Sequence, residues 1–361
     1  MKRDTLVDFF DSIVRQEGTA LAYDDGLRPR SYTYAQLEAA ARRFAARLAE
    51  AGAGRGDRVV LWSENRPEWV AAFWGCLLRG VAVAPIDERH SEDFGARVVR
   101  ITGPKAILLG EAPQPRALPP GVPVWRLEEL DWRTPGPPPP PVEIAASDIV
   151  QILFTSGATA DPKGVVITHR NILANIVPVE REIRKYLHYA RPFRPIRFLN
   201  LLPLSHMFGQ AMAAFIPPIL GGTVIFLRTQ DPREIVRQIR TRRISVMVSV
   251  PRILELLREY ILAMAPEAGQ PAPAGERFWR RWWRYRRVHS LFGWKFWSFI
   301  VGGAALDAAL EEFWGNLGFA VIQGYGLTEA APIVTLNHPF HARRGSVGKP
   351  IAGVEIRIAP D

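Results

Sequence analysis

Cysteine is nearly absent from this sequence of 361 residues, which contains only Cys76. A single cysteine excludes an internal disulfide and is typical of a reducing compartment, so we expect a cytoplasmic protein. The sequence also lacks any run of about 20 apolar residues, the length that a membrane-spanning helix requires. Asp4 and Asp8 interrupt the first residues before an apolar segment can form, so we expect no secretory signal.

Acidic residues are too few to balance the basic ones. There are 36 Asp and Glu against 46 Lys and Arg, which gives a formal net charge of +10. Such an excess indicates anionic partners, namely nucleic acid, anionic lipid or phosphorylated ligands, and the charge alone does not choose among them. The length fits two to three domains of the usual ~100–200 residues.

Helical and strand-like segments alternate along most of the chain. Residues 33–51 carry apolar side chains at helical spacing, and residues 58–62 and 81–87 have the composition of buried strands. This alternation predicts an α/β fold with parallel strands. Five consecutive prolines at 137–141 form an extended connection, either a stiff loop within one core or a domain boundary. We predict an N-terminal α/β subdomain over 1–145, a second over 146–335, and the start of a β-rich subdomain over 336–361, cut short.

Residues 155–164, TSGATADPKG, form a segment of small residues with one lysine. The segment follows a strand-like run and precedes a helical pattern at 169–187, so we expect it to join a strand to a helix. Backbone N–H groups in such a loop can hold a phosphate, and Lys163 adds a positive charge. The Walker pattern does not fit, because Gly164 and Val165 follow the lysine. Taken alone, the segment could equally be a surface turn.

Four segments together resemble motifs of the adenylate-forming superfamily, which comprises acyl-CoA synthetases, luciferases and peptide-synthetase adenylation domains. In chain order they are 155–164, PLSHMFG at 203–209, GGA at 302–304 and GYGLTE at 324–329. The resemblance covers nearly the whole chain. It implies the large N-terminal core of that fold, two mixed β-sheets flanked by helices in an αβαβα-like order, without the small C-terminal domain. The superfamily's later ribose-binding motif is missing, so we expect an N-terminal portion of a longer enzyme, weak or inactive alone.

The resemblance also implies ATP and Mg²⁺ as ligands, CoA as co-substrate, and a site within 146–335. The implied catalytic residues are Lys163, His206, Thr328 and Glu329, with Glu329 as the metal ligand. The implied nucleotide-binding residues are Thr155, Ser156, Gly157, Thr159, Lys163, Gly302, Gly303, Ala304, Gly324, Tyr325, Gly326 and Thr328. Ala158 and Ala160 depart from the superfamily pattern, in which Ser or Thr and Gly are usual.

The chemistry of these residues agrees with the implied roles. Glu329 offers a hard oxygen ligand, and Mg²⁺ takes only one or two carboxylates while keeping most of its waters. Tyr325 can present its ring to adenine between two glycines; the alternative is a core aromatic. His206 is interpreted as a wall of the carboxylate and acyl site, against a packed or capping histidine, and Ser205 as a cap or a ligand.

Residues 277–287, RFWRRWWRYRR, consist only of arginine and aromatic residues. On a helical wheel the aromatics, Tyr285 included, share one side and the arginines, except Arg286, share the other. This pattern predicts an amphipathic basic helix that lies on an anionic membrane, or else a helix whose aromatics pack on the core. We expect no nucleic acid, because no recognition module accompanies the stretch. The segment up to the GGA turn resembles an insertion of long-chain fatty acid ligases.

We therefore expect ATP-dependent activation of a fatty acid, in particular a long-chain one, to acyl-AMP and transfer of the acyl group to CoA. We also expect a cytoplasmic protein that associates with membranes. One alternative is a ligase that passes the acyl group to a carrier protein. Another is a non-catalytic protein that binds acyl nucleotides or docks on membranes.

Overall fold

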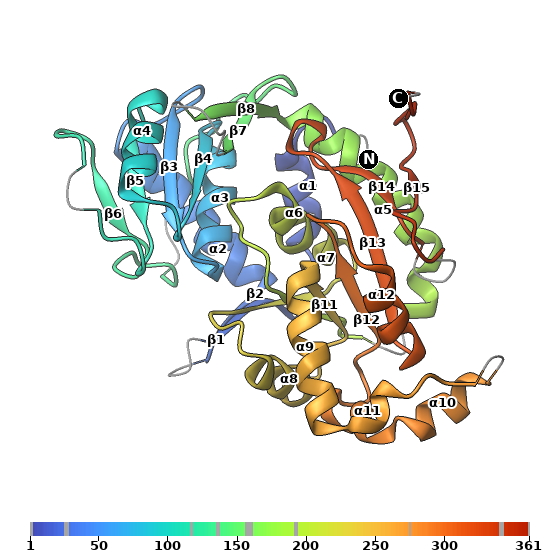
Figure 1. The fold of residues 1–361 in the computed structure, drawn as a ribbon. Helices are drawn as coiled ribbons and strands as arrows, with labels where there is room; N and C mark the ends of the chain where they lie inside the picture. Colours follow the sequence, from blue (N-terminus) through green and yellow to red (C-terminus); the bar gives the residue numbers. More distant parts are fainter. Residues whose placement is uncertain are drawn as a thin grey trace.

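The computed structural model describes residues 3–24, 29–115, 118–134, 138–155, 162–190, 194–273, 276–338 and 343–359. Over these ranges the chain forms two mixed β-sheets with helices between them and on their outer faces (Figure 1). The fold class predicted from the sequence is therefore confirmed.

The first sheet is parallel except at one edge. Its strands, in spatial order, are β6 (Val124–Arg126), β5 (Ala106–Leu109), β3 (Arg58–Ser63), β4 (Ala82–Asp87), β7 (Ile149–Thr155) and β8 (Lys163–Thr168). β7 and β8 pair as an antiparallel hairpin, in which Thr155 lies opposite Lys163. The hairpin places the two ends of the predicted phosphate loop side by side.

The second sheet combines strands from three parts of the chain. In spatial order they are β15 (Lys349–Pro350), β14 (Ile333–Leu336), β13 (Ala320–Gly326), β12 (Ser298–Val301), β11 (Val246–Ser249), β9 (Arg197–Asn200), β10 (Thr223–Leu227), β1 (Thr19–Asp24) and β2 (Pro29–Thr33). The β1–β2, β13–β14 and β14–β15 pairs are antiparallel, and the others are parallel.

The two sheets exchange strands across the boundary predicted at residues 145 and 146. β1, near the N-terminus, pairs with β10 in the second sheet, whereas β7 pairs with β4 in the first. The sheets thus divide the chain differently from the ranges 1–145, 146–335 and 336–361, which stay a prediction about domains.

The helices complete a layered arrangement. They are α1 (Leu6–Ile13), α2 (Tyr34–Glu50), α3 (Pro67–Leu78), α4 (Glu92–Thr102), α5 (His169–Ala190), α6 (Met207–Gln210), α7 (Ile216–Ile219), α8 (Pro232–Thr241), α9 (Pro251–Met264), α10 (Phe278–Arg284), α11 (Arg286–Phe292) and α12 (Ala308–Asn316). A π-helical turn, Ala211–Phe215, joins α6 to α7, and 3₁₀ turns cover Pro266–Gly269 and Thr328–Ala330.

Alternate side chains of each sheet belong to different cores. In β3, Val59 and Leu61 face the layer between the sheets, whereas Val60 and Trp62 pack outward against α4. This period of two is what a strand buried on both faces requires. On the far side of the second sheet, Met247 belongs to a third core formed with α8, α9, α11 and α12.

α3 lies in the layer between the sheets and is buried along almost its whole length, from Pro67 to Leu77. A helix that is apolar on all sides is stable only when other elements surround it. Trp74 packs against Phe10, with ring centroids 4.8 Å apart, and against Phe215, at 5.8 Å. These rings join α1, α3 and the π-helical turn into one core beneath the site. No helix in the described ranges combines the length and apolar character that crossing a membrane requires.

Candidate functional site

Three of the four predicted motifs meet at the carboxyl end of the second sheet. β12 and β13 are parallel with Val301 opposite Gln323, so Gly302, which directly follows β12, lies beside Gly324 of β13. A Cβ added to Gly302 would lie 2.8 Å from the ring of Phe208 and 3.4 Å from the Gly324 carbonyl oxygen. Ligands of α/β sheets bind at the carboxyl ends of the strands, and glycine permits the close approach seen here. The segments 203–209, 302–304 and 324–329 therefore lie together and make up one candidate site.

Gly303 extends this site as a tight turn. Its φ of +82° is in the left-handed region, which glycine adopts at no steric cost. Ala304 follows directly and is exposed. The turn thus presents backbone groups at the surface of the site.

Tyr325 lies on the surface rather than in the core. Its side chain is 46% exposed, and it precedes a bulge at which the pairing of β13 with β14 shifts register. The bulge needs glycine at the next position, because a Cβ on Gly326 would lie 2.2 Å from the Pro332 carbonyl oxygen. The structure therefore does not support the alternative that Tyr325 is a core aromatic.

The 3₁₀ turn Thr328–Ala330 follows β13 and carries two of the predicted residues. Glu329 is exposed and Thr328 is half-buried. Strand β8, which begins at Lys163, packs against this turn. The lysine strand and the acidic turn thus lie side by side, although they are far apart in the sequence. An accessible carboxylate beside a hydroxyl is a donor set that Mg²⁺ accepts, since this ion uses few protein ligands.

The predicted phosphate loop joins two strands, and the expected strand-to-helix connection is wrong. Lys163 begins β8, and α5 starts only at His169, after the hairpin. The run of β-branched residues in GVVIT favours a strand, which the sequence interpretation overlooked. The backbone of Thr155 is described, whereas Ser156, Gly157, Thr159 and the two atypical alanines, 158 and 160, lie outside the described residues. Lys163 is exposed.

Asn175 of α5 fixes the turn that carries Thr328 and Glu329. Its Nδ2 donates to the carbonyl oxygens of Ala330 (3.2 Å) and Ile333 (2.7 Å), and its Oδ1 accepts from the Ile333 N–H (3.1 Å). The side chain is buried. Asn175 belongs to none of the motifs predicted from the sequence. A possible signal was a polar residue within the apolar stripe of α5, next to Ile172 and Ile176.

The segment 203–209 is held from both sheets. Asn65, which follows β3, donates to the Leu202 carbonyl oxygen (2.7 Å) and accepts from the Leu204 N–H (2.8 Å). Asn200, at the end of β9, donates to the Gly209 carbonyl oxygen (3.0 Å). Both asparagines were missed by the sequence analysis, and both fix backbone groups of the motif.

Two glutamines connect the same segment to the strand that leads into the phosphate loop. Gln151 of β7 and Gln210 of α6 exchange two hydrogen bonds of 2.9 Å, and Gln210 also donates to the Leu204 carbonyl oxygen at 2.9 Å. Both side chains are fully buried. Because buried amides are costly unless satisfied, this pair holds the two segments at a fixed distance.

His206 stands at the N-terminal end of α6 and makes no side-chain capping bond. The ring is exposed, yet the surrounding protein removes enough water to lower its pKa, an effect that nearby Asp87 opposes and His90 and Arg89 reinforce. At neutral pH the imidazole is therefore uncharged. Ser205 is not a cap either, because its hydroxyl donates to Asp87 at 3.4 Å.

Asp87 ends β4 and faces this segment from the first sheet. Burial raises its pKa, but two guanidinium bonds and one backbone bond from Arg89, at 2.8–2.9 Å, outweigh burial and leave the pKa below its usual range. Asp87 is therefore ionised at neutral pH and places a negative charge near His206.

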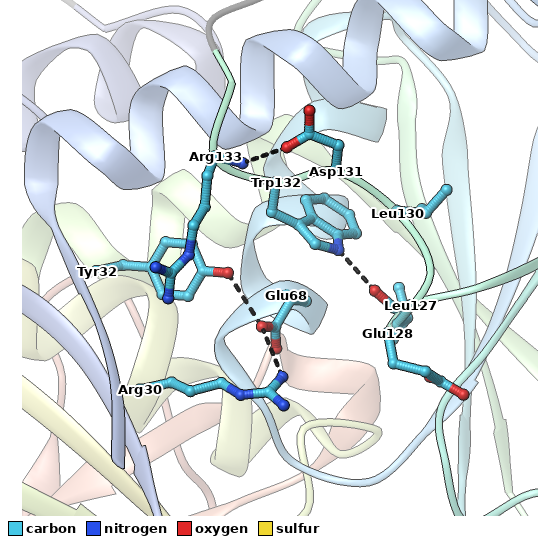
Figure 2. Close-up of a pocket in the computed structure, with 9 residues that line it drawn as sticks. All are labelled: Arg30, Tyr32, Glu68, Leu127, Glu128, Leu130, Asp131, Trp132 and Arg133. Atoms are coloured by element: carbon cyan, nitrogen blue, oxygen red, sulfur yellow. Dashed lines mark hydrogen bonds and ion pairs between the residues drawn. The ribbon is translucent and has the colours of Figure 1, made fainter. Parts of the chain in front are cut away.

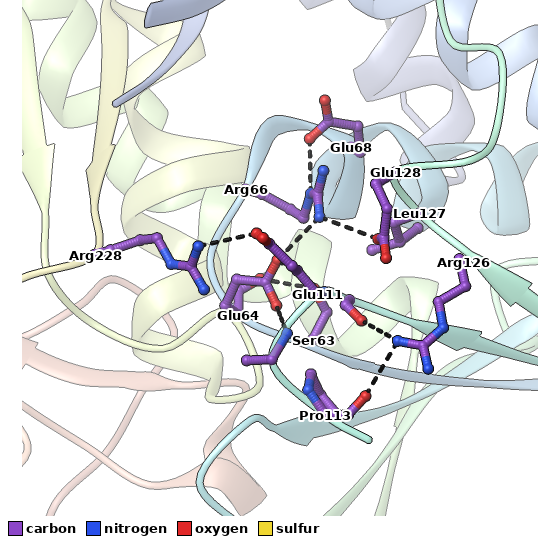
Figure 3. Close-up of polar contacts among 12 residues, drawn as sticks. Ser63, Glu64, Arg66, Glu68, Glu111, Pro113, Arg126, Leu127, Glu128 and Arg228 are labelled. Atoms are coloured by element: carbon purple, nitrogen blue, oxygen red, sulfur yellow. Dashed lines mark hydrogen bonds and ion pairs between the residues drawn. The ribbon is translucent and has the colours of Figure 1, made fainter. Parts of the chain in front are cut away.

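A buried ionic cluster includes the residues on either side of Asn65 in the sequence, Glu64 and Arg66 (Figure 3). Arg66 contacts Glu64 at 3.0 Å and Glu68 at 2.9 Å, and all three side chains are almost completely buried. Burial alone would lower the pKa of Arg66, but Glu68, Glu64 and Glu128, the last at 3.5 Å, raise it above its usual value. Arg228, after β10 of the second sheet, pairs with Glu111, after β5 of the first, at 2.9 Å. These contacts connect the sheets behind the site.

A cavity of about 230 Å³ lies next to this cluster (Figure 2). Tyr32 and Glu68 line it, and the Tyr32 hydroxyl donates to Glu68 at 3.0 Å. The remaining wall comes from Arg30, from residues 127 and 128, and from residues 130–133, and none of the predicted site residues lines it. In the described residues no group of three or more His, Cys, Asp and Glu side chains is arranged to hold a metal ion.

Comparison with known proteins identifies the family of this chain. The family model of AMP-binding enzymes matches residues 10–361. The chain is 28% identical to a feruloyl-CoA synthase from an Amycolatopsis species, over 96% of this chain and 62% of that protein. It is 29% identical to the long-chain-fatty-acid–CoA ligase FadD13 of Mycobacterium tuberculosis, over 91% of this chain and 61% of that protein. The chain thus spans about three fifths of the length of these relatives.

Solved structures share the fold. The N-terminal domain of FACL13 from Mycobacterium tuberculosis matches with a TM-score of 0.73 at 24% identity, over 98% of this chain and 83% of that one. The o-succinylbenzoate CoA synthetase of Bacillus subtilis, solved with ATP and magnesium, matches with a TM-score of 0.73 at 22% identity, over 99% of this chain and 67% of that one. With the family match over nearly its whole length, this chain belongs to the AMP-binding enzymes, and it has the fold of their N-terminal domain.

Proposed function

We propose that the native protein activates a carboxylic acid with ATP and transfers the acyl group to CoA. In the first step a carboxylate oxygen attacks the α-phosphorus of ATP, and pyrophosphate leaves. In the second step the CoA sulfur attacks the acyl carbon, the thiol proton is released and AMP leaves. The observation that carries the proposal is the contact of Gly302 with Phe208 and Gly324, because it brings three motifs to one sheet end.

The first step requires two anions to approach each other. Positive charge and donors aimed at the phosphates are therefore the main contribution of the protein. In this proposal Lys163 and the loop that it closes hold the β- and γ-phosphates, while Thr328 donates to the α-phosphate and Glu329 holds Mg²⁺, which offsets the phosphate charge. The packing of β8 on the turn Thr328–Ala330 supports this assignment. The further loop donors proposed are Thr155, Ser156, Gly157 and Thr159.

Adenine is assigned to the surface formed by the two glycine turns. The exposed ring of Tyr325 offers a stacking face there. The other proposed contacts are backbone groups of Gly302, Gly303, Ala304, Gly324 and Gly326. His206 forms a wall of the acyl site. His206 has no general-base role, since a carboxylate nucleophile carries no proton to remove. Because its imidazole is uncharged at neutral pH, His206 does not attract the carboxylate by charge either.

We propose a long-chain fatty acid as the substrate. The relatives are named for ferulate, coumarate and long-chain fatty acids, so the family supports a CoA ligase without fixing the acid. The basic, aromatic segment 277–287 favours a substrate that comes from membranes, and it makes the protein membrane-associated on the cytoplasmic side in this proposal. A carrier protein is the alternative acceptor, since a peptide-synthetase structure shares the fold.

The test measures acid-dependent pyrophosphate release and the acyl product of the native protein. Ferulate, coumarate and fatty acids of increasing length are compared, with CoA or a carrier protein as acceptor. We expect Glu329→Gln and Lys163→Ala to lower the rate by ~10²-fold or more, the scale for losing one preorganised electrostatic contact. The matched exposed controls, Glu50→Gln and Lys105→Ala, should retain the rate. Unchanged rates in the site variants would refute the proposal, and a product formed only with the carrier would establish the alternative acceptor.

A further inference from the structure

The tryptophans that the structure describes as exposed gather in one short stretch of the chain. Among the tryptophan side chains that the structure describes, only Trp282, Trp283, Trp294 and Trp297 are exposed, by 44%, 65%, 70% and 37%. Large apolar side chains that gather on the surface mark sites of interaction. We name residues 277–297 the tryptophan corner. It lies at the outer edge of the molecule, beside α9 (Figure 1).

The corner is not the single amphipathic helix that the sequence predicted. α10 ends at Arg284 and α11 begins at Arg286. Between them Tyr285 is fully buried, and its hydroxyl donates to the Gln270 carbonyl oxygen at 2.6 Å. Tyr285 therefore leaves the aromatic face on which the helical wheel placed it. Trp294 and Trp297 join the exposed tryptophans from the turn after α11, where no helical periodicity indicated them.

The corner carries most of the net positive charge of the chain. Residues 277–297 contain no Asp or Glu but hold seven basic residues, against a total net charge of +10. Those seven are Arg277, Arg280, Arg281, Arg284, Arg286, Arg287 and Lys295. Acidic residues outside the corner offset part of this charge, since Arg284 pairs with Glu276 at 2.9 Å and Arg287 lies 3.8 Å from Glu267. The corner nevertheless stays strongly basic.

Cations and exposed rings lie next to each other. The guanidinium of Arg286 is 4.6 Å from the ring centroid of Trp283, and the ammonium of Lys295 is 5.4 Å from that of Trp294. A surface that combines tryptophan with arginine and lysine matches the boundary of a bilayer, where the rings reach headgroup level and the cations contact phosphates. Each of these two pairs provides both kinds of group at one position.

A packed platform displays these side chains. Val288 and Phe292 of α11 are buried, and Phe292 stacks on Phe296 with ring centroids 5.0 Å apart. Trp282 stacks on His289 at 5.7 Å, and burial lowers the pKa of that histidine, which is therefore uncharged at neutral pH. Because the platform is ordered before any partner binds, docking does not require a segment to fold.

We propose that the tryptophan corner docks on a membrane surface of anionic phospholipid. The complementary charge selects the anionic headgroup, and the exposed rings give the corner the apolar contact that a purely electrostatic site would lack. Strand β12 begins at Ser298, directly after Trp297, and leads to Gly302, so one short strand connects the docking surface to the site. This inference does not depend on which acid is activated.

The test measures sedimentation of the native protein with vesicles of phosphatidylcholine alone or mixed with phosphatidylserine, without ATP or acid. We expect binding only to the mixed vesicles, and weaker binding at higher salt. Arg286→Gln with Arg287→Gln should weaken it about 30-fold, since each basic residue near such a surface contributes roughly 5-fold. The matched control Arg15→Gln with Arg100→Gln removes the same charge from exposed positions elsewhere and should change binding far less.

A second pair of variants tests the apolar contribution. Trp283→Ala with Trp294→Ala removes two tryptophan rings that are 65% and 70% exposed. The double variant should weaken vesicle binding without changing the urea midpoint, because neither ring is among the core residues. Equal binding to both vesicle types, or equal loss in the control, would overturn the proposal. It would also be overturned if a single-stranded oligonucleotide bound through the same arginines while vesicles did not. Activity plays no part in this readout, so its failure is distinguishable from failure of the ligase proposal.

Discussion

Replacing Asn175 with alanine removes the side chain that ties α5 to the turn carrying Thr328 and Glu329. Three hydrogen bonds are lost, to the carbonyl oxygens of Ala330 and Ile333 and from the Ile333 N–H. Asn175 and Ile333 are both buried, so water cannot easily replace the two bonds at Ile333. Ala330 is half-buried, and water can reach its carbonyl group.

The expected loss of stability follows from these positions. An unsatisfied buried backbone group costs about 1–3 kcal/mol, and a group that water can reach costs much less. Two such groups, partly relieved by movement of the turn, give a loss of roughly 2–4 kcal/mol in the free energy of unfolding. Because the turn moves, the KM for ATP should rise as well.

Asn171 provides the matched control on the same helix. It is exposed, and it accepts hydrogen bonds from the N–H (2.9 Å) and hydroxyl (2.7 Å) of Thr168. Asn171→Ala should therefore cost about 1 kcal/mol, as loss of a helix cap does, and leave the KM for ATP unchanged. Urea unfolding and the ATP dependence of pyrophosphate release measure both effects. If the two variants lost stability equally and had the same KM, the role assigned to Asn175 would be refuted.

Three further predictions concern other parts of the molecule. Gly302→Ala places a methyl group 2.8 Å from the Phe208 ring. The variant should bind an acyl-adenylate analogue ~10-fold or more weakly, with little change in the urea midpoint. Binding as tight as that of the unchanged protein, measured by calorimetry, would contradict the assembly of the site. Arg66→Ala leaves Glu64 and Glu68 buried without the guanidinium and should lower the free energy of unfolding in urea by ~3–5 kcal/mol. Arg55→Ala breaks an exposed ion pair and should change that free energy little. Equal losses in the two variants would show that the cluster is not structural. Burial lowers the pKa of His169 to about 4. Between about pH 6.5 and 4 the histidine is therefore protonated in the unfolded chain but not in the folded one, and the free energy of unfolding falls as the pH drops. The loss is roughly 2 kcal/mol at pH 5. His169→Asn should remove that part of the pH dependence of the unfolding free energy, measured by urea titration at several pH values. If the variant kept the same pH dependence, His169 would not be its source.

The sequence predicted the alternation of elements and the order of the motifs, because each depends on local pattern. Residues 33–51 were expected as a helix and form α2, Tyr34–Glu50, since their apolar residues keep one spacing throughout. The glycines of the 302–304 and 324–326 turns were assigned to the site, and the structure brings them together. Their use is local, because only glycine permits such close approach.

Predictions failed where distant contacts decide the structure. β8 is a strand because it pairs with β7 at the edge of the first sheet, and that edge is not visible in local sequence. Tyr285 is buried because residues 284–286 leave the helical path that the wheel assumed, which turns its ring to the core and its hydroxyl to Gln270. Likewise, β1 joins the second sheet through its pairing with β10, about two hundred residues later in the chain.

The buried amides show how far sequence reasoning reaches at such a site. Asn175, Gln151 and Gln210 are each a single polar residue in an apolar stretch, whereas Asn65 lies in the polar run SENR at 63–66. Either setting fits a solvated side chain as well as one that bonds to buried backbone. Only the packing of the two sheets decides, because it brings the partner groups within reach. Their partners include backbone groups within or beside two motifs, so these side chains set the distance between the acyl segment, the strand before the phosphate loop and the acidic turn. The motif residues contact the ligands in our proposal, whereas the amides place the motifs. Substitutions at the amides should therefore raise KM for ATP and for the acid together, even though no amide is assigned to either ligand.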